Sequence, residues 1–94
     1  MIITIKQLRE LTEKLYSHLE ETGHKEIELT EDYYWNIEKT ELYNPIEDPK
    51  QIDLGQLSFD WEILQGVLDK RKEPIIWDLV PLSAILRFIG EKEF

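Results

Sequence analysis

The chain has 94 residues, of which 41% are apolar and 33% charged, with 20 acidic against 11 basic side chains and a net charge of −9. This composition excludes a disordered chain, and the lack of cysteine excludes a disulfide framework and a thiolate metal site. The negative charge repels phosphate backbones and anionic headgroups, so we expect no nucleic-acid partner and no membrane partner.

The N-terminal segment predicts an amphipathic helix over about residues 5–22. Thr4 and Gln7 form a capping-box pattern, and Gly23 is a natural stop. Apolar residues then recur at spacings of three and four along one stripe: Ile5, Leu8, Leu11, Leu15 and Leu19. We expect this stripe to pack on the core.

Residues 26–37 allow two interpretations. Apolar residues at odd positions favour a half-buried strand interrupted near Glu31. Thr30 as a cap, followed by two acids, favours a short helix instead. We favour a strand at 26–29 followed by a helical turn, with Trp35 buried and Tyr34 exposed.

A loop punctuated by Pro45 and Pro49 follows, and residues 51–54 form a possible extended segment that ends at Gly55. The next helix is predicted over about residues 58–72, with Ser58 as its cap. Gly66 in its interior costs about 1 kcal/mol relative to alanine, which indicates the close approach of another segment.

The last helix is predicted over about residues 79–89. The apolar run at 75–77 suits a short strand, Asp78 suits the cap, and Pro81 is acceptable in a first turn. A helix that is apolar nearly all round is normally buried. The fold class is therefore α+β and mainly helical, with three helices and short extended segments between them in a single globular domain over residues 1–94.

Catalytic and metal-binding patterns are missing from the sequence. His18 and His24 do not share a helical face and lack the spacing of zinc ligands. There is no P-loop, no glycine-rich dinucleotide motif and no nucleophile elbow. We expect no enzyme, no cofactor and no metal site, in a cytoplasmic protein.

Arg87 is the only charged residue between Leu79 and Ile89. It either forms a buried structural ion pair with the acidic segment or lies on an exposed edge and pairs with Glu91 one turn away. The sequence leaves both alternatives open.

Three segments resemble a family of small bacterial proteins: DYYWNI at 32–37, DLGQLSFDWEIL at 53–64 and DLVPLSAILRFIG at 78–90. That family has no established activity. The resemblance implies a bacterial origin and transfers no functional residue.

Residues 20–48, here called the acidic segment, hold ten acids and two bases, a net charge of −8, around a cluster of aromatic residues. Electrostatic steering and aromatic anchors together favour binding of a basic protein partner, in the manner of an inhibitor or immunity protein. The candidate contacts are Glu28, Glu31, Asp32, Tyr34, Glu38 and Glu41.

Two alternatives remain. The first is a homodimer or an assembly subunit in which Trp61, Trp77 or Phe88 completes an apolar interface, while the acids keep the particle in solution. The second is a small enzyme or ligand-binding module that uses clustered carboxylates, which requires a concave pocket.

Overall fold

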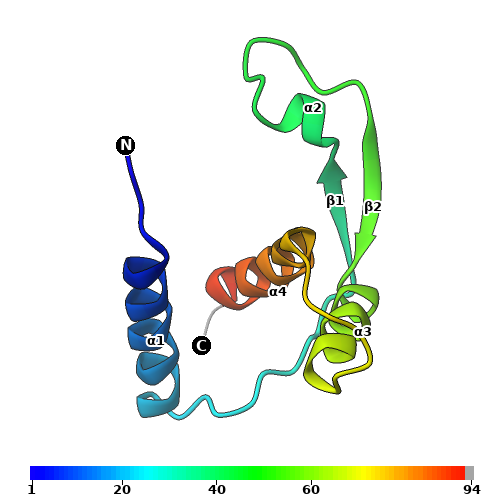
Figure 1. The fold of residues 1–94 in the computed structure, drawn as a ribbon. Helices are drawn as coiled ribbons and strands as arrows, with labels where there is room; N and C mark the ends of the chain where they lie inside the picture. The colour runs from blue at the N-terminus through cyan, green and yellow to red at the C-terminus, as the bar shows by residue number, and fades with distance from the viewer. Residues whose placement is uncertain (93–94) are drawn as a thin grey trace.

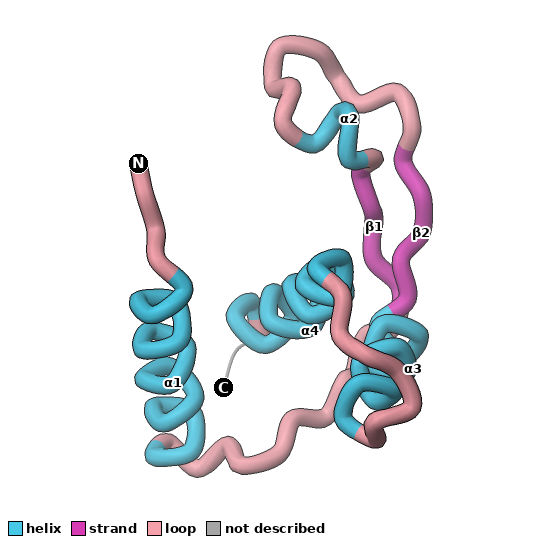
Figure 2. Tube along the Cα trace, in the orientation of Figure 1, coloured by secondary structure: helices cyan, strands magenta, loops and turns pink. Residues whose placement is uncertain are grey.

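The computed structural model describes residues 1–92. Figures 1 and 2 show a helix that stands apart, a pair of helices and a long hairpin arm. In chain order the elements are α1 (Ile5–Glu21), β1 (Tyr33–Ile37), α2 (Lys39–Leu42), β2 (Ile52–Gln56), α3 (Leu57–Leu68), the 3₁₀ turn η1 (Ile76–Asp78) and α4 (Leu79–Glu91). The predicted class, α+β and mainly helical, is confirmed.

The first helix has the predicted termini. The Thr4 hydroxyl accepts the Gln7 N–H at 3.1 Å, and the Gln7 side chain accepts the Thr4 N–H at 3.1 Å, which completes the capping box. The helix ends at Glu21, and Gly23 then adopts φ +93°, a conformation that glycine adopts without a side-chain clash.

Tyr33–Ile37 form strand β1, so the predicted helical turn there is wrong, and no regular element forms at 26–29. β1 pairs antiparallel with β2, with Trp35 opposite Leu54. Backbone hydrogen bonds from a segment about twenty residues away thus outweigh the local capping signal at Thr30. The second extended segment also runs past its predicted end, because Gly55 lies inside β2.

Helix α3 begins at Leu57 and ends at Leu68, four residues before the predicted end. Lys70 has φ 60°, and the N–H groups of Arg71 and Lys72 both donate to the Gly66 carbonyl, which closes the helix. The predicted strand at 75–77 does not form. Ile76 and Trp77 belong to η1 and Ile75 precedes it, because the Asp78 carboxylate accepts the Ile75 N–H at 2.9 Å and the Lys72 ammonium at 2.6 Å.

Helices α3 and α4 pack against each other and enclose the small core. Within residues 1–92 the buried apolar side chains are Leu57 at 4% exposed, Ile85 at 7% and Pro81, which is fully buried. Leu79 and Val80 remain exposed, so the expectation of an α4 buried all round is wrong. None of the helices in this part of the chain could span a bilayer.

Candidate functional site

One face of the β1–β2 pair is apolar and open to solvent. The register places Tyr33, Trp35 and Ile37 of β1 on the same side as Gln56, Leu54 and Ile52 of β2, because directly opposed residues share a face. Trp35 is 75% exposed and Leu54 is 63% exposed, which overturns the prediction that Trp35 is buried. We call Tyr33, Trp35, Ile37, Ile52 and Leu54 the ribbon face.

The other side of the strand pair is fixed to α3. The ring of Tyr34 lies over Gly55, where a side chain would collide with it, and the phenol O–H donates to the buried Asp60 carboxylate at 2.6 Å. Burial, and then this carboxylate, raise the pKa of Tyr34 above its ordinary value. Tyr34, predicted to be exposed, therefore anchors the strands and is half-buried.

Asp32 anchors the start of α3 across 26 residues of chain. Its carboxylate accepts the Ser58 N–H at 2.9 Å and the Gln56 side-chain amide at 2.8 Å, while its carbonyl accepts the Leu57 N–H at 2.7 Å. The Gln56 amide, and then the Ser58 N–H, lower the pKa of Asp32. The helix is therefore capped by a distant aspartate, whereas the sequence predicted Ser58 as the cap.

Glu41 also serves the fold. Its carboxylate accepts the N–H groups of Gln51 and Lys50, both at 3.0 Å, and these donors lower its pKa in the same order. We call the set of contacts made by Asp32, Tyr34, Glu41 and Asp60 the junction. Three of the six proposed partner contacts thus form intramolecular hydrogen bonds at the junction.

The other three proposed contacts, Glu28, Glu31 and Glu38, are not among the residues that form the junction. Glu28 and Glu31 are exposed in the segment before β1, and Glu38 is half-exposed at the start of α2. The Glu28 carbonyl accepts the Lys92 ammonium at 3.1 Å, which ties the end of the described chain to this segment. Arg87 is exposed and pairs with Glu91 at 2.9 Å, the second of the two alternatives for that residue.

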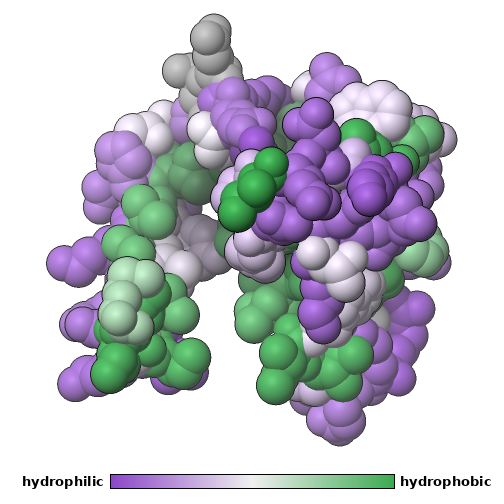
Figure 3. All heavy atoms as spheres, turned by 90° about the horizontal axis from the view of Figure 1, so that it is seen from above, coloured by the Kyte–Doolittle hydropathy of each residue, from purple (hydrophilic) through white to green (hydrophobic). Residues whose placement is uncertain are grey.

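The apolar stripe of α1 is equally open. Among its five residues, Ile5 is 68% exposed, and Leu8, Leu11 and Leu15 are also exposed. The broad helix-to-helix packing of the fold involves α3 and α4, not α1. Figure 3 shows hydrophobic surface on two separate arms of the molecule, with an open hollow between them.

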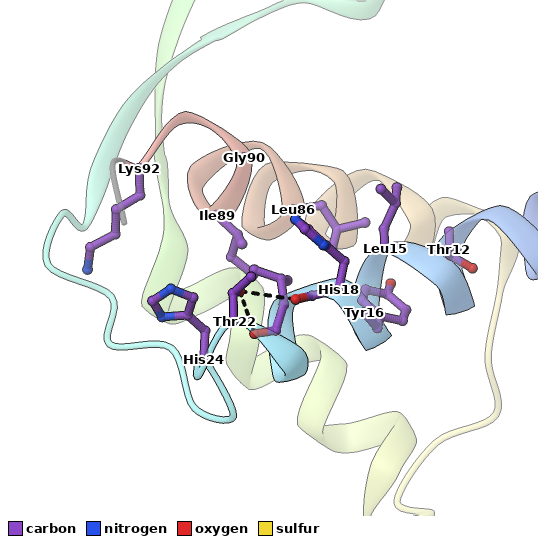
Figure 4. A pocket seen from close by; sticks show the side chains of 11 residues that line it. Thr12, Leu15, Tyr16, His18, Thr22, His24, Leu86, Ile89, Gly90 and Lys92 are labelled. Atoms are coloured by element: carbon purple, nitrogen blue, oxygen red, sulfur yellow. Dashed lines mark hydrogen bonds between the residues drawn. The ribbon is translucent and has the colours of Figure 1, made fainter.

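A cleft of about 490 Å³ lies between the C-terminal half of α1 and the end of α4. Figure 4 shows His18 projecting from α1 toward α4, with His24 and Lys92 at one end of the cleft. Leu15, Leu19, Leu86 and Ile89 form its apolar walls. Within residues 1–92 no group of three or more histidine or carboxylate side chains is placed to hold a metal ion.

Compared with known proteins, the chain matches no family model, no curated protein and no solved structure at a significant level. The resemblance to a bacterial family therefore stays a prediction. The most prominent features of the structure are its two open apolar surfaces, the ribbon face and the α1 stripe.

The ribbon face had a signal in the sequence. The alternation of Tyr33, Trp35 and Ile37 indicates a strand with one apolar side, but whether that side faces the core or the solvent is not determined by alternation. That choice depends on Tyr34, whose contact with Asp60 turns the opposite side toward α3.

Proposed function

We propose that this chain is a self-associating subunit whose apolar surfaces are buried against a second copy of itself. The observation that supports the proposal is the accessible surface of the chain, 8607 Å². A compact monomer of 11.3 kDa exposes about 5,700 Å². The excess is therefore about 2,900 Å², more than one partner contributes to a standard interface, about 800 Å².

The dimensions of the chain agree with its surface area. Its radius of gyration is 15.2 Å, against about 12 Å for a compact domain of this length. Many of the exposed apolar residues gather in two groups, on the ribbon face and along α1. Others lie on α3, η1 and the start of α4, where Trp61 and Trp77 of the predicted apolar interface are exposed and Phe88 is half-buried. Burial of these groups supplies the favourable free energy of association.

Light scattering after size exclusion, at low and high salt, tests the proposal. We expect a dimer of 22.6 kDa, twice the mass of the chain, that persists at high salt because apolar burial is not screened. Leu8→Glu on the stripe should shift the mass toward the monomer. The control Gln7→Glu adds the same charge on the polar face and preserves the capping box, so it should remain a dimer. A wild-type monomer at both salt concentrations contradicts the proposal.

A second candidate function, binding of a basic protein by the acidic segment, is favoured by the loop that follows α2. Tyr43 and Ile46 are exposed there beside the acids Glu47 and Asp48. Exposed aromatic and apolar groups amid negative charge are the features of a steered interface.

Capture experiments at low salt can test this second candidate. The variant should carry Glu28→Lys, Glu31→Lys and Glu38→Lys, and should keep Asp32 and Glu41 because these hold backbone N–H groups of the fold. We expect the wild type to capture a basic protein at low salt. The variant, although folded, should not capture it, and the wild type should release it at high salt. Capture of the same proteins by both chains contradicts this function.

A further inference from the structure

We infer that the ribbon face of one copy is covered by the α1 stripe of a second copy, and reciprocally, in a two-fold dimer. This inference rests on the proposed self-association and specifies which surfaces meet. In a two-fold interface each chain contributes both surfaces, so the two contacts form together.

The two surfaces have compatible shapes. The ribbon face is a strip five residues long on a two-stranded sheet, which is marginal in water until its apolar side is covered. Helix α1 has 17 residues and is about 25 Å long, so its stripe spans the strip, which is about 17 Å long. A helix stripe on a sheet face is a standard way to bury both.

The exposed area of the two surfaces reaches the lower end of the range for a stable interface. Four exposed residues of the ribbon face and four of the stripe are involved: Tyr33, Trp35, Ile52, Leu54, Ile5, Leu8, Leu11 and Leu15. The exposed fractions of these residues range from 42% for Leu8 to 75% for Trp35. An aromatic side chain buries roughly 150–250 Å² and an aliphatic one roughly 60–120 Å², so the set exposes on the order of 600 Å² per chain. Stable interfaces bury about 600–1,000 Å² per partner.

Charge favours this pairing over like-with-like pairing. Residues 5–15, the exposed part of the stripe, carry three bases, Lys6, Arg9 and Lys14, against two acids, a net of +1. The two acids at the end of the helix lie in the acidic segment and bring the whole of α1 to −1. The acidic segment that contains β1 has a net charge of −8. Two acidic segments repel each other, whereas the positively charged residues 5–15 of α1 are attracted to an acidic segment.

The chain's own α1 lies elsewhere. Its C-terminal half faces α4 across the cleft that Leu86 and Ile89 line. The stripe residues Ile5, Leu8 and Leu11 extend beyond that cleft and are exposed. The chain's own α1 does not cover the ribbon face from this position, whereas the α1 stripe of a second copy can.

Cysteine cross-linking tests the inference without background, because the chain has no cysteine. Leu8→Cys and Leu54→Cys are made as separate proteins, mixed so that subunits exchange, and joined with a short bismaleimide. We expect the cross-linked dimer that joins Leu8→Cys to Leu54→Cys to form in a higher yield than the cross-linked dimer of either variant with itself. In a control mixture, Glu13→Cys, on the polar face of α1, should form little cross-linked dimer with Leu54→Cys.

Each other outcome is decisive. A dimer that cross-links only Leu8→Cys to itself, or Leu54→Cys to itself, overturns the inference and leaves self-association standing. The double variant Leu8→Cys/Leu54→Cys supplies the remaining test. If it is a monomer and its two cysteines are cross-linked within one chain, both the inference and the proposed self-association are wrong, because the chain's own α1 then covers the ribbon face.

Charge variants supply a second measurement that does not disturb apolar packing. Arg9→Glu together with Lys14→Glu should raise the dimer dissociation constant about tenfold at low salt, and the difference should shrink at high salt. In the control, Arg71→Glu reverses a charge on the loop after α3 and should change the dissociation constant much less. An unchanged or lower dissociation constant for the α1 variant contradicts the inference.

Discussion

Helix α1 and the junction differ in what determines them. The sequence of α1 specifies its start, its apolar stripe and its end, and yet most of that stripe is exposed. The junction has weak local signals but is fixed by hydrogen bonds between residues about 10 to 26 positions apart. Local patterns thus specify an element, whereas distant polar contacts decide what it is attached to. Substitutions can separate the two cases.

The largest effect should come from the core beside the junction. Leu57→Ala removes a buried side chain, so we expect the free energy of unfolding to fall by about 2–5 kcal/mol in urea titration at fixed protein concentration. Leu68→Ala, at the exposed end of the same helix, is the matched control and should cost less than about 1 kcal/mol. Equal costs would show that α3 packs differently.

Gly55→Ala tests the close approach of strand and ring. The new methyl group meets the Tyr34 ring and displaces it, so we expect a loss of about 2–3 kcal/mol by the same titration. Gly90→Ala, in open space on α4, should be neutral or stabilise by up to about 1 kcal/mol. In a Tyr34→Ala background the cost at Gly55 should disappear, and its persistence there would refute the proposed clash.

Tyr34→Phe isolates the hydrogen bond to Asp60. The variant leaves a buried carboxylate without this donor, so we expect a loss of about 1–2 kcal/mol, against less than about 0.5 kcal/mol for Tyr33→Phe on the exposed face. Because the pKa of Tyr34 is raised, its contribution is present below pH 10, the ordinary tyrosine pKa, and is lost as pH rises. Absorbance titration of the wild type should show one tyrosine that ionises at a higher pH than the others, and this late step should be missing from Tyr34→Phe.

Acid should weaken the junction. The pKa values of Asp32 and Glu41 are lowered from 3.8 and 4.5, so the folded state binds fewer protons and their contribution is present above those values. Stability is therefore lost as pH falls below about 4.5 and through the lowered folded values. Asp32→Asn should flatten the pH dependence of the urea midpoint, and an unchanged slope would contradict the capping role.

Much of the helical fold could be predicted because its signals are local. The capping box at Thr4, the stop at Gly23 and the position of Pro81 depend on neighbours within a turn, and the structure confirms them. The pairing of β1 with β2 could not be predicted. It depends on contacts across about twenty residues, which neither alternation nor propensity encodes.

The candidate site was predicted in part. The sequence drew attention to the aromatic cluster, but it could not assign Tyr34 to the junction and Trp35 to the solvent. It also could not separate acids that cap backbone groups, such as Asp32, from exposed ones such as Glu31, because both look alike as charges. The open stripe of α1 was interpreted as a core-packing face, since amphipathicity does not say which chain supplies the partner.

Small-angle X-ray scattering of the wild-type chain tests the central claim most directly, because one experiment yields both mass and radius of gyration. We expect a particle of 22.6 kDa, twice the chain mass of 11.3 kDa, at micromolar concentration and at both low and high salt. A particle of 11.3 kDa with a radius of gyration near 12 Å would contradict it, because a single chain would then have covered its own apolar surfaces.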